Sequence, residues 1–163
     1  MCAATSVELN ASELRIAIVA SRFNEYITLR LVEGARDALL GRKIPRENIT
    51  EIWVPGAWEL PMAAQALAAT GRYHALVCLG CVIRGETSHH LYVAGEAARG
   101  IASVSLQTGV PIGFGVLTTE TMEQAAARAA PGPDNKGADA ALAALEMIAV
   151  LRRIGPPASS RPQ

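Results

Sequence analysis

Charged and aromatic side chains are scarce in this sequence of 163 residues. Charged residues make up 18% of it and aromatic residues 4%, whereas half of all residues are hydrophobic. The fifteen basic and fifteen acidic residues balance, so the chain has no basic excess with which to bind nucleic acid or an acidic membrane surface. So few charges also indicate that copies of the chain cover part of one another's surface.

Long apolar runs are absent as well. The longest, ALVCLGCVI at residues 75–83, is less than half of the ~20 residues that a membrane-spanning helix needs. The amino-terminal stretch MCAATSVELNASELR has no basic segment followed by an apolar block, which a secretory signal would show. The sequence therefore predicts a cytoplasmic protein that does not bind membranes.

Cysteine occurs only at Cys2, Cys78 and Cys81. The CLGC motif could form a redox pair or half of a zinc site. It lies in a strand-like run, however, where residues three apart point to opposite faces of the sheet. No second cysteine pair completes a metal site. We therefore interpret Cys78 and Cys81 as small buried apolar residues and expect no metal.

Strand-like and helix-like segments alternate along the chain. Continuous apolar or β-branched runs predict strands, and apolar residues at helical spacing predict helices. Thr121 and Gln124 form a capping-box pattern at the start of one helix, and Pro61 fits a helix only in its first turn. The expected strands are residues 15–20, 48–54, 74–83 and 111–118, and the expected helices are residues 25–42, 56–70, 89–108, 121–130 and 137–154.

This alternation predicts an α/β fold, in which a central, mostly parallel sheet carries helices on both faces. We expect an N-terminal segment over residues 1–13, a single domain over residues 14–154 and a disordered tail over residues 155–163. In such sheets, ligands bind outside the carboxyl ends of the strands. The loops SRFNE, VPGAWE, IRGETSHH and VLTTET are therefore the candidate sites.

The stretch GETSHH holds two of the three histidines. Gly85 follows a strand and a helix begins near His89, so the amides of Glu86, Thr87 and Ser88 lie near a helix N-terminus. Such amides attract an anion, typically phosphate, and a histidine beside an anion suits proton transfer near neutral pH. The two histidines could equally be a polar helix start. They could also be metal ligands, although no Cys, Asp or Glu stands at ligand spacing.

Three other loops carry candidate binding residues. Phe23 and Asn24 suit a flat heterocycle, one by stacking and the other by hydrogen bonding, whereas the alternative for a phenylalanine is the core. Glu59 follows Trp58 at a helix start, where its carboxylate could accept hydroxyl protons from a polyol or favour the helix dipole. Lysine is scarce, and Lys136 in DNKG lies between two helices, which indicates either a functional position or a solvated loop.

Taken together, these loops resemble the lumazine synthase family. The matching stretches, in family order over residues 14–154, are VASRFNEYI, VPGAWELP, GCVIRGETSHH, FGVLTTETMEQAAARA and NKGADAALAALEM. The resemblance implies a flavodoxin-like three-layer α/β/α subunit with a central parallel sheet. It also implies assembly into pentamers, twelve of which close into an icosahedral shell in some members.

The activity that the resemblance implies is the penultimate step of riboflavin biosynthesis. The enzyme condenses 5-amino-6-(D-ribitylamino)uracil with 3,4-dihydroxy-2-butanone 4-phosphate to 6,7-dimethyl-8-ribityllumazine, releasing phosphate and water. No metal or organic cofactor takes part in this reaction.

Each matching residue has an implied role. His89 would transfer protons with Asp139 as a partner, and Arg128 would bind phosphate. The pyrimidine would contact Phe23 and Asn24, and its uracil edge Val82 and Ile83. The ribityl chain would contact Ala57, Trp58 and Glu59, and the phosphate Gly85, Glu86 and Thr87. The neighbouring subunit would contribute Phe114, Arg128 and Lys136.

The chain departs from the family pattern in two places: directly after the proton-transfer histidine, and in APGPD at residues 130–134, where several members carry a basic residue. After the proton-transfer histidine the family usually has Phe or Tyr and then an acidic residue, where this chain has His90 and Leu91. His90 could change the pKa of His89 or take over its role. Two alternatives to the enzyme therefore stay open: a protein that binds a flavin or lumazine without turnover, and a shell-forming protein in which assembly alone matters.

Overall fold

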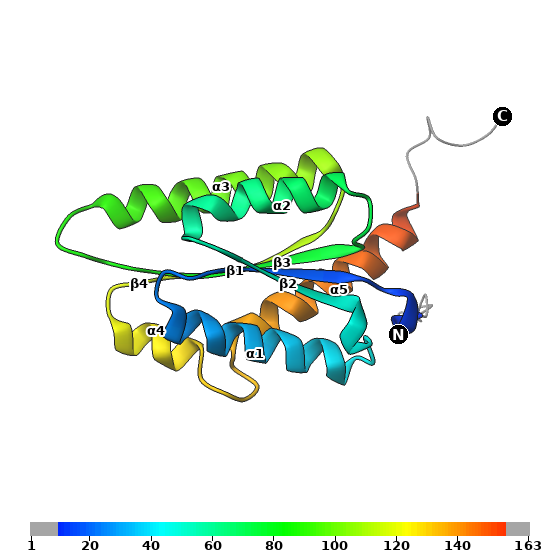
Figure 1. The fold of residues 1–163 in the computed structure, drawn as a ribbon, viewed down its shortest axis with the longest axis horizontal. Helices are drawn as coiled ribbons and strands as arrows, with labels where there is room; N and C mark the ends of the chain where they lie inside the picture. Colours follow the sequence, from blue (N-terminus) through cyan, green and yellow to red (C-terminus); the bar gives the residue numbers. More distant parts are fainter. Residues whose placement is uncertain (1–9, 156–163) are drawn as a thin grey trace, which may run out of the picture.

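The computed structural model describes residues 10–155 and shows one parallel sheet between two layers of helices (Figure 1). Its four strands lie in the order β2-β1-β3-β4, and all neighbouring strands are parallel. This is the order of the first four strands of a flavodoxin-like sheet, and the fold is the predicted three-layer α/β/α fold. The strands are β1 (Ile16–Ser21), β2 (Ile49–Val54), β3 (Ala75–Ile83) and β4 (Ile112–Thr119).

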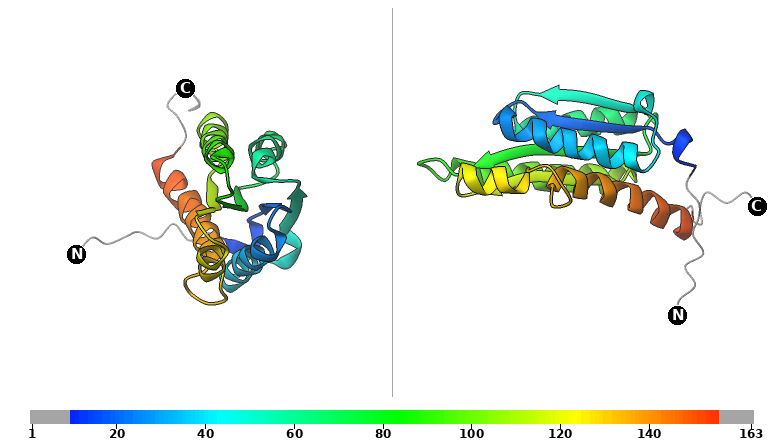
Figure 2. Two further views of the ribbon diagram at one scale, coloured as in Figure 1. Left: turned by 90° about the vertical axis from the view of Figure 1, so that its left-hand side faces the viewer. Right: turned by 90° about the horizontal axis from the view of Figure 1, so that it is seen from below.

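Helices cover both faces of the sheet, as the two further views also show (Figure 2). One layer consists of α2 (Leu60–Ala69) and α3 (His89–Thr108). The opposite layer consists of α1 (Glu25–Gly41), α4 (Met122–Arg128) and α5 (Lys136–Ile154). Short 3-10 helices occur at Ala11–Glu13, Arg46–Asn48 and Ala57–Glu59.

Strand β1 contributes to both halves of the core, because successive side chains of a strand point to opposite faces. Ile16 and Ile18 pack in the cluster that contains α1, α4 and α5 side chains, and Ala17 and Val19 pack in the cluster that contains α2 and α3 side chains. Every residue of β1 is buried. The sheet therefore holds its carboxyl edge between two packed layers of helices.

The two cysteines of the CLGC motif point to opposite faces of β3, as predicted. Cys78 belongs to the core on the α2–α3 side and Cys81 to the core on the other side. Burial raises the pKa of the Cys78 thiol to about 12 and that of Cys81 to about 11. Both thiols are therefore protonated near neutral pH and serve as apolar packing groups.

Most predicted boundaries agree with the structure within two residues, and the exceptions have local causes. The helix expected from residue 56 divides into the 3-10 turn Ala57–Glu59 and α2, because Pro61 has no amide proton to donate to the carbonyl one turn earlier. Pro61 does lie in the first turn of α2, as predicted.

The predicted capping box at Thr121 is half correct. The Thr121 hydroxyl accepts a hydrogen bond from the Gln124 amide at 3.2 Å, but Gln124 Oε1 accepts from the Glu120 amide at 2.9 Å, not from that of Thr121. The Thr119 hydroxyl donates to the Thr121 carbonyl at 3.0 Å in the same turn, and this turn presents the Glu120 amide to Gln124. The helix then ends at Arg128, two residues before the predicted end.

Residues 1–9 and 156–163 lie outside the described residues, and with them most of the predicted N-terminal segment and of the predicted disordered tail. Over residues 10–155, no helix has the length and hydrophobicity that crossing a bilayer would require.

Candidate active site

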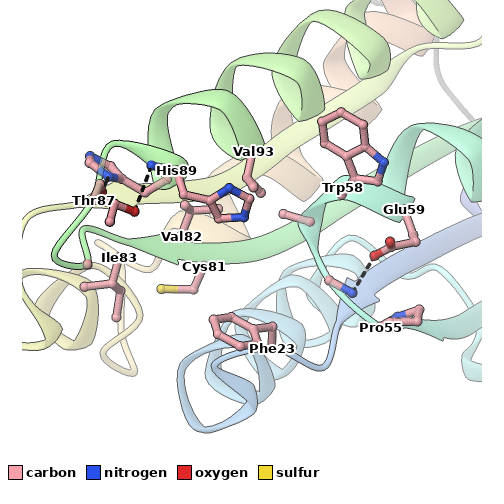
Figure 3. A pocket seen from close by; sticks show the side chains of 14 residues that line it. Phe23, Pro55, Trp58, Glu59, Cys81, Val82, Ile83, Thr87, His89 and Val93 are labelled. Carbon is pink, nitrogen blue, oxygen red and sulfur yellow. Dashed lines mark hydrogen bonds between the residues drawn. The ribbon is translucent and has the colours of Figure 1, made fainter.

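A cavity of about 490 Å³ opens at the carboxyl ends of β1, β2 and β3 (Figure 3). The chain runs from β1 outward to β2 and then returns to the other side of β1 to form β3. This is the switch point at which open parallel sheets bind ligands. We call this space the first cavity. Nine of the residues selected from the sequence line it: Phe23, Ala57, Trp58, Glu59, Val82, Ile83, Gly85, Thr87 and His89.

Backbone hydrogen bonds hold Phe23 at the rim of the first cavity. The amides of Arg22 and Phe23 donate to carbonyls at the end of β2 and the residue after it, at 2.8 and 3.0 Å. The next residue, Asn24, has a left-handed conformation with φ of 59°, and its Nδ2 donates to the Cys81 carbonyl at 2.9 Å. The Phe23 ring is left 70% exposed, so a flat ring system can stack on it.

Two of the selected residues, Asn24 and Glu86, line neither this cavity nor the second cavity described below. The amide nitrogen of Asn24 is bonded to β3, so this side chain shapes the loop that carries Phe23. The Glu86 side chain is exposed and lies outside the lining, which keeps its negative charge away from an anion in the loop.

The loop between β2 and α2 presents Trp58 and Glu59 to the cavity (Figure 3). The Gly56 amide donates to Glu59 Oε2 at 2.8 Å, which fixes one oxygen of the carboxylate. Within residues 10–155, no protein group donates to the other oxygen, so it is free to accept a hydrogen bond from a hydroxyl group.

The loop between β3 and α3 has the features of an anion site. A Cβ at Gly85 would meet no atom within 4 Å, so the backbone there is open to a ligand. Ser88 precedes α3 but its side chain does not cap the helix. The Thr87 hydroxyl accepts a hydrogen bond from the His89 amide alone, at 3.4 Å. The Leu91 amide donates to the Ser88 carbonyl at 3.0 Å, but no group within residues 10–155 accepts from the amides of residues 85–88, so these are available to a negatively charged group.

His89 and His90 both line the cavity but differ in their surroundings. The His89 side chain is exposed, and its ring lies beside Val82 and extends into the cavity (Figure 3). His90 is half-buried, and its Nδ1 lies 3.1 Å from the Thr87 carbonyl oxygen, so this nitrogen acts as a donor. Only Nε2 of His90 is then left for other partners, whereas both nitrogens of His89 can meet a ligand.

A second cavity, of about 420 Å³, lies between the edge strand β4 and helices α4 and α5. It gathers Phe114, Arg128, Lys136 and Asp139. Lys136 Nζ and Asp139 Oδ2 are 2.7 Å apart, and both side chains are about half exposed. Within one chain, Asp139 therefore pairs with Lys136 and lies in a different cavity from His89. A contact between Asp139 and His89 requires a second copy of the chain.

Sequence reasoning missed four further residues of the first cavity: Pro55, Gly56, Cys81 and Val93. Val93 stands four residues after His89 on the same helical face, a spacing that could have revealed it. Over the part of the chain that the structure describes, no three His, Cys, Asp or Glu side chains come together in an arrangement that could hold a metal ion.

The fold and the first cavity define an α/β protein of flavodoxin-like topology with a small-molecule site at the carboxyl edge of its sheet. The chain belongs to the 6,7-dimethyl-8-ribityllumazine synthase family, whose sequence profile matches residues 13–152. A similar protein from Edwardsiella ictaluri (strain 93-146), named 6,7-dimethyl-8-ribityllumazine synthase, is 58% identical over 146 residues, which cover 88% of this chain and 93% of the relative. These matches confirm the resemblance found in the five sequence stretches.

Proposed function

We propose that this protein is a 6,7-dimethyl-8-ribityllumazine synthase, a transferase of riboflavin biosynthesis. It condenses 5-amino-6-(D-ribitylamino)uracil with 3,4-dihydroxy-2-butanone 4-phosphate and releases phosphate and water. The observation that carries the proposal is the first cavity, which brings Phe23, Glu59 and His89 from three separate loops to one space in a chain of this family.

The pyrimidine substrate binds in the first cavity. Its ring stacks on the exposed Phe23 ring, and its edge bonds to the backbone of Val82 and Ile83 at the end of β3. The ribityl chain lies along Ala57, Trp58 and Glu59, whose free carboxylate oxygen accepts hydrogen bonds from the hydroxyl groups. Asn24 keeps the Phe23 loop in place through its bond to β3.

The butanone phosphate binds beside His89. The amides of Gly85, Glu86 and Thr87 hold the phosphate at the start of α3, and Glu86 contributes its amide but not its carboxylate. His89 moves protons during imine formation, phosphate loss and ring closure. Holding two reactive molecules together supplies much of the remaining acceleration.

The complete site forms between two copies of the chain. Phe114, Arg128 and Lys136 of one copy close the first cavity of its neighbour, where Arg128 binds the phosphate, Lys136 reaches the pyrimidine carbonyl and Asp139 approaches His89. Each copy carries the first and the second cavity at two different places on the chain. Such an arrangement is suited to a closed ring, in which every interface joins two different surfaces.

We propose a homopentamer in the cytoplasm. Large apolar side chains on the α2–α3 layer support assembly, since Met62, Tyr92 and Leu106 are 79%, 70% and 86% exposed in the single chain. Sedimentation equilibrium distinguishes a pentamer from a shell of twelve pentamers, and a monomer at micromolar concentration would contradict the shared site. Cell fractionation tests the location.

The proposed activity is tested by following lumazine formation by absorbance from the two substrates, after subtraction of the uncatalysed reaction. We expect the protein to accelerate the reaction and His89→Ala to lower kcat by about 100-fold, as expected for loss of a general acid–base group. The matched variant His90→Phe removes the other ring nitrogens but keeps a flat ring. It should retain most of the activity.

Two results would contradict this assignment. A larger loss in His90→Phe than in His89→Ala would transfer the proton-transfer role to His90. No acceleration by well-folded protein would refute the enzyme. Tight binding of the lumazine without turnover would then favour a binding protein, and a large particle with an inert site would favour a shell-forming protein.

A further inference from the structure

Asn135, directly before Lys136, is a buried polar residue with every side-chain position bonded. It is 1% exposed. Its Oδ1 accepts from the amides of Gly137 and Ala138 at 2.9 and 3.1 Å. Its Nδ2 has two hydrogens for three carbonyls, so one hydrogen is shared. These carbonyls, at 3.1, 3.0 and 3.2 Å, belong to Arg30, Ala129 and Ala130.

This one amide joins the three helices of its layer. Arg30 belongs to α1, Ala129 directly follows α4, and Gly137 belongs to the first turn of α5. The last residue of α4 is Arg128 and the first residue of α5 is Lys136. Asn135 therefore connects the two helix ends that carry the cations of the second cavity.

The helices leave little room around this amide. A Cβ added at Gly34 of α1 would lie 2.2 Å from Asn135 Oδ1. The absence of a side chain at Gly34 thus lets α1 approach the Asn135 amide closely. A shorter or displaced side chain at residue 135 would leave the buried Ala129 carbonyl without this donor, which is costly.

We propose that Asn135 is a positioning residue that sets Arg128 and Lys136 in their places at the second cavity. It does not touch a substrate and acts through these two cations. The inference rests on the proposed function in that it takes Arg128 as a phosphate-binding group.

The test compares Asn135→Ser, Arg128→Ala and the double variant. Serine keeps an oxygen that can cap α5 but removes the Nδ2 donor that joins α4 and α1. The dissociation constant of inorganic phosphate is measured by calorimetry, and kcat/KM is measured for lumazine formation. We expect Asn135→Ser to weaken phosphate binding and lower kcat/KM about tenfold each. When Arg128 is already alanine, it should change phosphate binding by no more than about twofold and lower kcat/KM by less than tenfold, because only Lys136 is then left to be displaced.

Two further variants separate positioning from a general loss of stability. Gly34→Ala displaces the Asn135 amide without altering it, so it should show the same dependence on Arg128 and keeps the test usable if Asn135→Ser does not fold. Asn48→Ser also removes an amide that donates to a carbonyl, that of Ser12 at 2.8 Å, but at the opposite end of the sheet. It should leave phosphate binding and kcat/KM unchanged.

Equal losses from Asn135→Ser with and without Arg128, or losses no larger than those of Asn48→Ser, would overturn the proposal. The two readouts keep it distinct from the proposed function. Phosphate binding that depends on both residues in a protein without turnover would support positioning and refute the synthase. Turnover with no such dependence would support the synthase and refute positioning.

Discussion

A methyl group at Gly137 tests whether the close contact of α5 with α1 determines activity. A Cβ at this position would lie 2.0 Å from the Leu31 carbonyl oxygen and 2.6 Å from its carbonyl carbon. A carbon–oxygen contact normally needs about 3.3 Å, so the start of α5 must move away from α1 by about 1 Å. Lys136 is the preceding residue, so it must move as well.

Two energies oppose each other in Gly137→Ala. Alanine is more favourable than glycine in a helix by about 1 kcal/mol, but overpacking costs about 1–3 kcal/mol. We expect the variant to be less stable than the parent by about 1 kcal/mol. A shift of 1 Å in a binding group can reduce activity by about 100-fold, so kcat/KM should fall by a factor between about 10 and 100.

Gly95→Ala is the matched control. Gly95 lies within α3, and an added Cβ there would meet no atom within 4 Å. This variant should gain about 0.5–1 kcal/mol with unchanged activity. Urea unfolding at one protein concentration and steady-state kinetics measure both effects. If Gly137→Ala were as stable as Gly95→Ala and fully active, the argument from close packing would be refuted.

Two further predictions concern ionisation. Arg36 donates to Glu51 at 2.8 Å and holds the pKa of that carboxyl below its ordinary value of 4.5. The resulting stability is present above pH 4.5 and is lost as the pH falls through the lowered pKa, so urea midpoints between pH 6 and pH 3 should fall more steeply for the parent than for Glu51→Gln. Parallel curves would contradict this. In a Cys2→Ser background, Cys78 and Cys81 should react slowly with a maleimide at pH 8 in the folded protein and rapidly in urea. Burial raises their pKa to about 12 and about 11. Rapid labelling without urea would contradict the packing described here.

Much of the fold could be predicted because its elements follow simple patterns. The apolar run at 75–83 is a central strand covered on both faces, and the helix beginning at His89 has the predicted bounds. The first cavity was also predictable in outline, because parallel strands place their following loops at one edge. Phe23, Glu59 and His89 are far apart in sequence but share that edge.

The remaining features depend on contacts that have no local signal. Asn135 in DNKG has the composition of a loop, and only the packing of three helices shows that its amide is buried and bonded. The engagement of Asn24 with β3 likewise depends on a left-handed backbone and a partner 57 residues away. Arg128 and Lys136 lie apart from His89 because of the side of β4 that the later helices cover. The apolar periodicity of a single helix does not show which side of the sheet it covers.

The central claim is a catalytic site shared between copies, and mixing two variants of low activity tests it most directly. Subunits with His89→Ala and subunits with Arg128→Ala are unfolded together, refolded at equal concentration and assayed for lumazine formation. Random mixing in a closed ring restores about a quarter of the interfaces, since each needs one intact His89 and one intact Arg128. We predict recovery of about that fraction of the parent activity. Activity no higher than the mean of the two separate variants would place both residues in a site within one chain and contradict the account.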